Sequence, residues 1–240
     1  MRLDVFLLEN GYVSSRTEAK GFISEGAVSV DGRVITKPAF DVDGDSKIEI
    51  DKSSKKYVSR GGLKLEAALD AFNIDVSSKM AIDIGASSGG FTDCLLQRGA
   101  TAVVAVDSGT AQLVSSLRAD ERVICIENYN ARYISSSDLP FVPQLAVMDV
   151  SFISAKLIIK PLFDCLSDGA DFVCLIKPQF EVGRANIGKG GIVKNEKVRE
   201  QARLDVIAFA ESVGFKCAGS ITSPIIGGDG NVEYLAHFKK

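Results

Sequence analysis

The chain has 240 residues, of which 46% are hydrophobic and 25% are charged, and its formal net charge is −3. This composition predicts a soluble globular protein with a sizeable core, built as one large domain or as an ordinary domain with a small one. No apolar run approaches the roughly 18 residues of a membrane span, and the N-terminus is too acidic for a secretory signal. The acidic total argues mildly against nucleic-acid binding, although it could hide a local basic face.

Cysteine and histidine usage narrows the chemistry further. Five cysteines are scattered along the chain, mostly within apolar runs, at positions 94, 125, 165, 174 and 217. We expect buried thiols in a reducing cytoplasm, rather than a disulfide framework or a zinc site. The chain has one histidine, His237, so a histidine-based metal site or catalytic triad has little support.

The first 51 residues predict a compact unit of their own. Apolar residues recur at helical spacing in two segments, which Gly11 and Gly26 end. The alternating run AVSVDGRVI contains Asp31-Gly32, a dipeptide typical of a two-residue β-hairpin turn. Another turn and strand follow in KPAFDVDGDSKIEI.

A polar stretch, DKSSKKYVSR, separates this unit from the rest of the chain. Its composition predicts a linker. We therefore divide the chain into a first domain of residues 1–52, a linker of residues 53–60 and a second domain of residues 61–240.

The first domain resembles the αL RNA-binding domain first seen in a small-subunit ribosomal protein. The resemblance covers RLDVFLLENGYVSSRTEAKGFISEGAVSVDGRVITKP, nearly the whole unit. In that fold, basic residues on the two-helix face meet RNA phosphates and shape. The resemblance implies RNA contacts for the matching cations, to which we add one from the linker: Arg2, Arg16, Lys20, Arg33 and Arg60. Singly, each could be an ordinary solvated charge, but as a set beside the motif they favour RNA.

From Met80 onward, apolar strand patterns alternate with helical patterns. The predicted strands cover residues 80–83, 102–106, 122–126, 144–149, 171–176, 215–222 and 231–238. The predicted helices cover residues 90–98, 110–119, 155–165 and 195–213. This alternation predicts an α/β fold with a mostly parallel seven-stranded sheet. Because a turn-rich segment joins the last two strands, we expect them to pair antiparallel and to leave one antiparallel strand at the edge of the sheet.

The segment from Ala81 to Gly109 predicts a ligand crevice. One strand ends on Asp83, a turn of small residues and a helix follow, and the next strand ends on Asp107. The turn lacks both the G-x-G-x-x-G pattern and the lysine of a phosphate-binding loop. An acid before a turn without cations suits a ligand with an ammonium and a sulfonium, and a carboxylate ending the second strand suits ribose hydroxyls.

S-adenosylmethionine (SAM) fits both of these features, whereas the alternative is a glycine turn kept only for packing. The residues that we assign to SAM from this segment are Asp83, Gly85, Ser87, Gly89, Gly90, Phe91 and Asp107.

Four charged residues outside the turn lie at positions where functional side chains are expected. They are Lys64 in the first turns of a helix, Asp149 and Lys177 at the ends of two strands, and Glu233 in the last strand. The carboxyl ends of parallel strands meet at the crevice, so Asp149 and Lys177 should lie beside SAM. A lysine that ends a strand is commonly only a snorkelling edge residue, but three other placed charges favour a functional role.

These four residues resemble the Lys-Asp-Lys-Glu tetrad of the FtsJ-like ribose 2′-O-methyltransferases. With the αL domain, the segments SRGGLKL, DIGASSGGFTDCLLQRGA, MDVSFIS, LIKPQFEVG and GNVEYL make the whole chain similar to the TlyA family. Members of that family carry haemolysin names and resemble rRNA cytidine 2′-O-methyltransferases. The resemblance implies catalytic roles for Lys64, Asp149, Lys177 and Glu233, with Lys177 as the base. It also places Asp149 beside SAM and Asn130 on the adenine side of SAM.

The predicted fold is therefore a small αL-type RNA-binding domain followed by a Rossmann-like SAM-dependent methyltransferase domain. The resemblance implies ribosomal RNA or ribosomal subunits as partner, a cytoplasmic location, and no need for a metal or a membrane. One departure concerns the family's interdomain tetrapeptide, Arg-x-Trp-Val, which reads Lys55-Lys56-Tyr57-Val58 here and puts only the detail of domain coupling in question.

The rRNA target is also an inference from the family. Longer members carry an extra N-terminal segment and modify both subunits, whereas shorter members modify the large-subunit RNA. Because the first motif begins at Arg2, we expect a cytidine of 23S rRNA to be modified, with little or no modification of 16S rRNA.

Three competing functions remain open at this point. A membrane-active haemolysin would need an amphipathic or spanning segment, and none is evident. An RNA-binding protein with a decayed methyltransferase half conflicts with the complete tetrad. An enzyme acting on a small molecule would leave the first domain unexplained.

Overall fold

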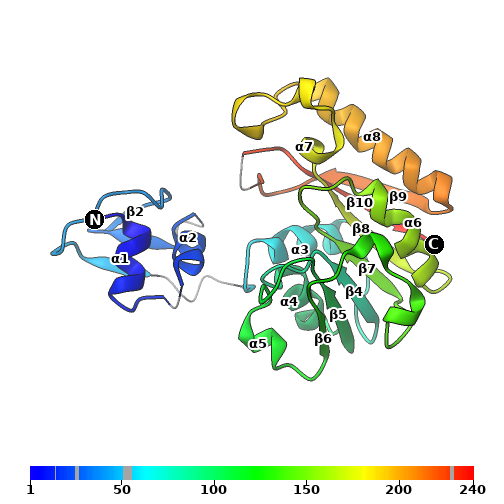
Figure 1. Cartoon of the computed structure of the whole chain (residues 1–240), viewed down its shortest axis with the longest axis horizontal. Coiled ribbons are helices and arrows are strands. Elements are labelled where there is room, and N and C mark those ends of the chain that lie inside the picture. Colours follow the sequence, from blue (N-terminus) through cyan, green and yellow to red (C-terminus); the bar gives the residue numbers. More distant parts are fainter. Residues whose placement is uncertain (14, 25–26, 51–55, 228–229) are drawn as a thin grey trace. The chain divides into compact units, whose positions relative to one another are not determined.

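The computed structural model describes residues 1–240 except 14, 25–26, 51–55 and 228–229. The chain divides into two compact units, Met1–Arg60 and Gly61–Lys240 (Figure 1). Gly26, which was predicted to end a helix, lies outside the described residues, as do residues 53–55 of the predicted linker. No helix in the described part of the chain is long and apolar enough to cross a membrane.

The first unit packs two helices against a small antiparallel sheet. The helices are α1 (Leu3–Glu9) and α2 (Arg16–Ser24). The sheet has the order β2-β1-β3 and consists of β1 (Val28–Val30), β2 (Arg33–Val34) and β3 (Ile48–Ile50). The predicted hairpin is confirmed, because Val30 pairs with Arg33 across the turn. Asp31 and Gly32 have φ values of 50° and 78°, the positive values that a tight two-residue hairpin turn requires.

The second unit is a seven-stranded sheet with helices on both faces. Its strands are β4 (Met80–Ile84), β5 (Ala102–Val106), β6 (Val123–Ile126), β7 (Leu145–Met148), β8 (Asp171–Ile176), β9 (Lys216–Thr222) and β10 (Tyr234–Lys239). Its α-helices are α3 (Gly61–Ala71), α4 (Gly90–Gln97), α5 (Ser115–Arg118), α6 (Lys156–Cys165), α7 (Pro178–Glu181) and α8 (Glu196–Val213). Short 3₁₀ turns are η1 (Ala131–Tyr133), η2 (Ser136–Asp138), η3 (Arg184–Asn186) and η4 (Lys189–Gly191).

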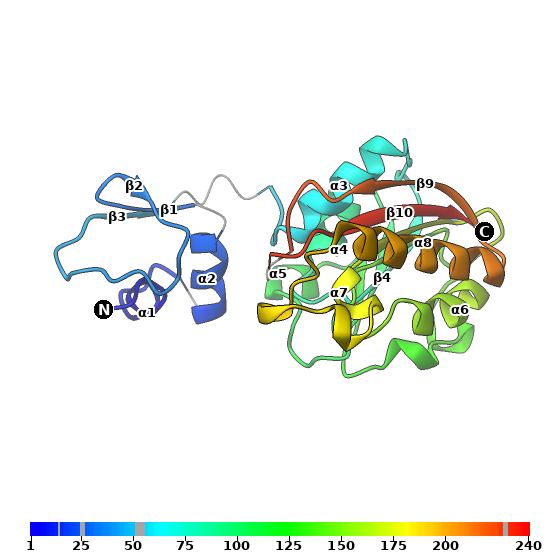
Figure 2. The same ribbon diagram turned by 90° about the horizontal axis from the view of Figure 1, so that it is seen from above.

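The sheet has the strand order β6-β5-β4-β7-β8-β10-β9, and the five strands from β6 to β8 are parallel. Helices α3 and α4 pack together on one face, and α6 and α8 pack together on the other (Figure 2). The main apolar core includes inward-facing side chains of the central strands and the buried faces of α6 and α8. The predicted mostly parallel seven-stranded α/β sheet is therefore confirmed.

Two sequence predictions about the last strands need correction. The antiparallel strand is β10, and it lies between β8 and β9 rather than at the edge. Burial explains this order: the first five residues of β10 are all buried, which suits an interior strand, whereas β9 is half exposed, which suits an edge. The strand also begins at Tyr234, so Glu233 precedes it instead of lying within it.

The helix predicted over residues 110–119 is wrong in its first half. Helix α5 covers only Ser115–Arg118, and Ala111 has a φ of 54°, which is incompatible with an α-helix. The backbone N–H groups of residues 111–113 donate to the side chain of Glu127 instead of forming helical bonds. A tertiary hydrogen-bond acceptor has therefore overridden local helix propensity.

A buried carboxylate, Asp171, contacts residues next to the first strand of the seven-stranded sheet and residues of its last strand. It lies at the end of the sheet where β4 and β8 begin. Asp171 accepts hydrogen bonds from Lys79 Nζ at 2.8 Å and His237 Nε2 at 2.7 Å, and its Oδ1 lies 2.6 Å from Lys239 Nζ. Burial by itself raises the pKa of Asp171, but the hydrogen bonds from His237, Lys239 and Lys79 outweigh it and hold the pKa below its ordinary value.

We expect Asp171→Asn to lower the free energy of unfolding at pH 7 by roughly 3 kcal/mol, because it leaves the surrounding cations without their buried partner. Because the folded pKa is depressed, this contribution is present above the unfolded value near pH 4 and is lost as the pH falls below it. Urea unfolding measures the effect. Asp164→Asn is the control: it breaks only an exposed helical pair with Lys160 and should cost less than about 0.5 kcal/mol. Equal losses in the two variants would contradict the assignment.

Candidate active site

A cavity of about 320 Å³ lies at the carboxyl ends of β4, β5 and β7. Of the residues that the sequence assigned to SAM, five line this cavity: Gly85, Ser87, Asp107, Asn130 and Asp149. The other four, Asp83, Gly89, Gly90 and Phe91, are not part of its lining. The cavity lies in the size range of small-ligand sites and at the position where open parallel sheets bind ligands.

The backbone of the turn after β4 passes very close to neighbouring segments. Gly85 has a φ of 84°, and a Cβ atom there would lie 2.3 Å from the backbone oxygen of Asp149. Gly89 has a φ of 98°, and its Cβ would lie 2.3 Å from the side chain of Leu117. Only glycine therefore lets the turn pass this close to β7 and to α5.

Asp83 lies wholly buried in β4, behind this turn. Its Oδ2 accepts a hydrogen bond of 2.7 Å from Thr92 Oγ1 in α4, and its Oδ1 has no hydrogen-bond partner among the described residues. Burial raises the pKa of Asp83 to about 7, and the nearby charges of Asp149 and Asp107 add to this rise. Asp83 therefore supports the turn from behind rather than forming the wall of the cavity.

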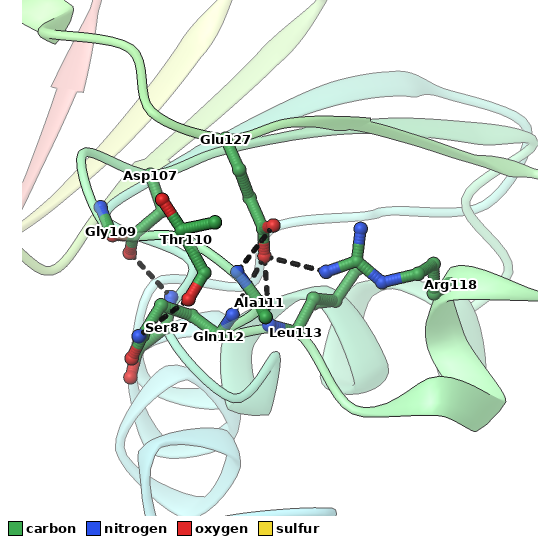
Figure 3. Close-up of polar contacts among 9 residues, drawn as sticks. All are labelled: Ser87, Asp107, Gly109, Thr110, Ala111, Gln112, Leu113, Arg118 and Glu127. Carbon is green, nitrogen blue, oxygen red and sulfur yellow. Dashed lines mark hydrogen bonds and ion pairs between the residues drawn. The ribbon is translucent and has the colours of Figure 1, made fainter.

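Asp107 follows β5 and is held in one orientation by the backbone. Its Oδ2 accepts from Ser87 N–H at 2.7 Å, and its Oδ1 accepts from Gly109 N–H at 2.7 Å (Figure 3). Each carboxylate oxygen has further lone pairs, so the side chain can still accept bonds from a ligand. A carboxylate fixed in this way is prepared to bind a diol without reorganising.

The charge of the cavity lining is one-sided. Within the described part of the chain, the lining residues include the carboxylates of Asp107 and Asp149 but no lysine, arginine or histidine. Such a lining suits a ligand with positive charge and hydroxyl groups and disfavours a phosphate.

The four predicted catalytic residues form two ion pairs. Lys177 Nζ lies 2.5 Å from Asp149 Oδ1 and donates a 2.8 Å hydrogen bond to Ser151 Oγ. Lys64 Nζ lies 2.6 Å from Glu233 Oε2, with both side chains largely buried. Sequence reasoning missed Ser151, which lines the cavity two residues after Asp149.

The sheet register places one residue of each ion pair at the same end of the sheet. In the antiparallel pairing of β8 with β10, Ile176 is opposite Tyr234. Lys177 directly follows Ile176, and Glu233 directly precedes Tyr234, so both residues flank this paired position. The insertion of β10 beside β8 therefore brings Glu233, the partner of Lys64, to the end of the sheet where Lys177 contacts two residues of the cavity wall.

The predicted RNA-binding residues of the first unit include one organised cluster. Arg2 Nε lies 3.0 Å from Asp4 Oδ1, and Arg16 Nε lies 2.9 Å from Asp4 Oδ2. The Asp4 side chain is fully buried, whereas the two arginine side chains are nearly half exposed. The hydrogen bond from Arg2 is the largest cause that lowers the pKa of Asp4 to about 2, and Arg16 contributes to the shift. Sequence reasoning missed Asp4, although an acid on the apolar side of a helix was a usable signal.

The remaining predicted RNA-binding cations are separate from this cluster. Lys20 and Arg33 are exposed, and Arg60 is half-buried.

We expect Asp4→Asn to destabilise α1 and α2 locally by roughly 2 kcal/mol, because a buried carboxylate that receives charged hydrogen bonds is lost. Hydrogen exchange of the full-length chain should show faster exchange in these two helices and no change in the second unit. In the unsubstituted protein, this protection should persist above the unfolded pKa of about 4 and be lost as the pH falls toward 2. Asp45→Asn, at an exposed carboxylate of the same unit, should change nothing, and equal effects would refute the role of Asp4.

Comparisons with known proteins agree with this geometry. The FtsJ-like methyltransferase family matches residues 57–240, and the S4 domain matches residues 1–48. A putative hemolysin from Streptococcus thermophilus has a solved structure that superposes with a TM-score of 0.80 at 46% identity, covering 100% of this chain and 88% of that one. A putative S-adenosylmethionine-dependent methyltransferase from Listeria monocytogenes shares the fold at 16% identity, with a TM-score of 0.56 over 75% of this chain and 98% of that one.

Three curated relatives carry rRNA methyltransferase names. The putative rRNA methyltransferase YqxC of Bacillus subtilis is 46% identical over 98% of this chain and 84% of its own length. The 16S/23S rRNA (cytidine-2'-O)-methyltransferase TlyA of Mycobacterium tuberculosis is 42% identical over 98% and 88%. The 23S rRNA (cytidine-2'-O)-methyltransferase TlyA of Campylobacter jejuni is 36% identical over 80% and 75%. The chain belongs to the TlyA family of FtsJ-like methyltransferases, with an S4 domain in front of the methyltransferase domain.

Proposed function

We propose that the protein transfers the methyl group of SAM to the ribose 2′-oxygen of a cytidine in 23S ribosomal RNA. The observation that carries this proposal is the position of Lys177. It forms an ion pair with Asp149 and a hydrogen bond with Ser151, and both of these residues line the cavity. A lysine at the mouth of an acid-lined cavity can take a proton from a hydroxyl that meets the ligand there.

The residues of the cavity fit SAM. The fixed carboxylate of Asp107 can accept bonds from the ribose hydroxyls, and Asn130 offers a polar side chain on the same wall. The carboxylates of Asp107 and Asp149, with buried Asp83 behind them, give the site a negative potential that favours an ammonium and a sulfonium.

The tetrad divides the chemical work between its two pairs. Bound SAM supplies an electrophilic methyl group attached to a positive sulfur. Lys177 in its neutral form accepts the proton of the 2′-hydroxyl at Nζ while that oxygen forms its bond to the methyl carbon and the carbon–sulfur bond breaks. Asp149 and Ser151 hold Nζ in place for this step, and Glu233 orients Lys64 as the second pair of the tetrad. Much of the rate then comes from positioning.

The choice of substrate is supported by the relatives and by the first unit. The names of both TlyA relatives contain 23S rRNA, whereas 16S appears in only one of them. The S4 domain places exposed arginines at Arg2 and Arg16, which suit contacts with RNA phosphates. With ribosomal RNA as the substrate, the proposed location of the protein is the cytoplasm. The paired tetrad argues against a decayed methyltransferase half, and no helix in the described part of the chain could span a membrane.

We expect Lys177→Ala to lower methyl transfer to ribosomal subunits by about 100-fold or more, because the general base is lost. Calorimetric binding of SAM should change by only a few-fold, since Lys177 is not part of the cavity lining. Transfer of tritium from labelled SAM measures the rate, and Lys160→Ala, an exposed lysine on α6, is the matched control. Turnover above about a tenth of the unsubstituted rate would show that Lys177 is not the base.

The rRNA target has its own test. Primer extension at limiting nucleotide concentration detects 2′-O-methylation as a stop. In cells that lack their own enzyme of this kind, expression of the protein should create a stop at a cytidine of 23S rRNA and none in 16S rRNA. The Lys177→Ala variant is the control, and a new stop in 16S rRNA would overturn the proposed selectivity.

A further inference from the structure

The segment between β5 and α5 forms part of the cavity wall without regular secondary structure. Ser108 and Gln112 line the cavity, while Ala111 has its backbone in the left-handed region. The backbone N–H of Gly109 donates a hydrogen bond to Asp107 Oδ1, and Gln112 Nε2 donates to the backbone oxygen of Thr110 at 3.1 Å. Three consecutive backbone N–H groups of this segment, at residues 111–113, form no helical hydrogen bonds. All three donate to a single side chain instead (Figure 3).

That side chain is Glu127, which directly follows β6. Its Oε2 accepts from Ala111 N–H at 2.8 Å, and its Oε1 accepts from Gln112 N–H at 2.8 Å and Leu113 N–H at 3.1 Å. Arg118 of α5 donates a fourth bond of 2.7 Å to Oε1. The bond from Arg118 is the largest cause that lowers the pKa of Glu127 to about 2, so the carboxylate is charged throughout the physiological range.

Backbone hydrogen bonds also connect the two segments on either side of this contact. Asn128 N–H donates to the oxygen of Gly109 at 2.9 Å, and Tyr129 N–H donates to the oxygen of Asp107 at 3.0 Å. Glu127 itself does not line the cavity, whereas Tyr129 and Asn130 after it do. One largely buried carboxylate therefore sets the shape of two neighbouring stretches of the wall without itself lining the cavity.

We propose that Glu127 is a positioning residue for the methyl donor: it holds residues 108–113 in the one conformation that completes the SAM site. The proposal rests on the proposed function, namely that SAM occupies this cavity. Without Glu127, three neighbouring N–H groups lose their common acceptor, and the segment spends only part of its time in the binding conformation. The apparent dissociation constant then rises in inverse proportion to that fraction. Asp149 and Lys177 directly follow β7 and β8 and make no bond to this segment, so the transfer step itself is left intact.

The test compares Glu127→Ala and Glu127→Gln with the unsubstituted full-length protein. Glu127→Gln keeps the size of the side chain and one accepting oxygen, so it should be intermediate. Calorimetry with SAM should show a dissociation constant about tenfold higher or more for Glu127→Ala, while kcat at saturating SAM stays within about threefold. Hydrogen exchange without any ligand should be faster at residues 111–113 in this variant.

Asp120→Ala is the matched control. Asp120 also accepts from an arginine and from a backbone N–H, both of Arg122, and lies just before the same strand, but it makes no bond to residues 108–113. Its loss should leave SAM affinity within about twofold, because the cavity wall keeps its anchor.

The outcomes separate this proposal from the proposed function. If the unsubstituted protein binds no SAM, the proposed function fails and takes the role of Glu127 in SAM binding with it. If the unsubstituted protein binds SAM and Glu127→Ala binds it equally well, or exchange at residues 111–113 is unchanged, only the positioning role is overturned. A parallel fall in kcat and in global stability would make Glu127 a general structural residue instead.

Discussion

The site depends on the way the last strand enters the sheet. Strand β10 inserts antiparallel between β8 and β9, and its register pairs Tyr234 with Ile176, so Glu233 and Lys177 flank the same paired position. The lysine is thereby flanked by the acid of β7 on one side and by the end of β10 on the other. A parallel strand in this place would begin at the other end of the sheet and could not deliver Glu233 there. The buried, apolar character of β10 favours the insertion, so packing energy brings Glu233 to this end of the sheet.

Buried carboxylates are the recurring means by which this chain fixes local geometry. Asp4 holds two arginines in the first unit, Asp171 holds two lysines and a histidine where β4 and β8 begin, and Glu127 holds three backbone N–H groups at the cavity. In each case the acid is buried or largely buried and its donors are charged or lie on the backbone. The net charge of −3 therefore says little about a local surface: the carboxylates of Asp4 and Asp171 are buried, while Arg2 and Arg16 reach the surface.

Charge is also distributed unevenly around the cavity. Its wall includes two carboxylates among apolar and polar side chains, and Lys177 contacts two residues of that wall, Asp149 and Ser151. Under the proposed function, the acids of the wall attract the cationic donor, and Lys177 activates the hydroxyl. The partition matches the proposed transfer from SAM to a ribose oxygen, in which the base must be close to the donor without repelling it.

The sequence by itself determined the two-unit architecture and the seven strands of the main sheet, because periodicity and turn residues are local signals. The catalytic roles of the four tetrad residues stay a prediction from the family resemblance. The resemblance to the TlyA family, confirmed by the relatives, supplied the activity. Only the tertiary structure decided the place of β10 in the sheet, the pairing of Lys64 with Glu233, and the loop at residues 110–114 where a helix was expected. The physical reason is common to all three: each is set by a partner distant in sequence, such as Glu127 for the loop, and no local pattern reports which side chain will meet which backbone once the strands have packed.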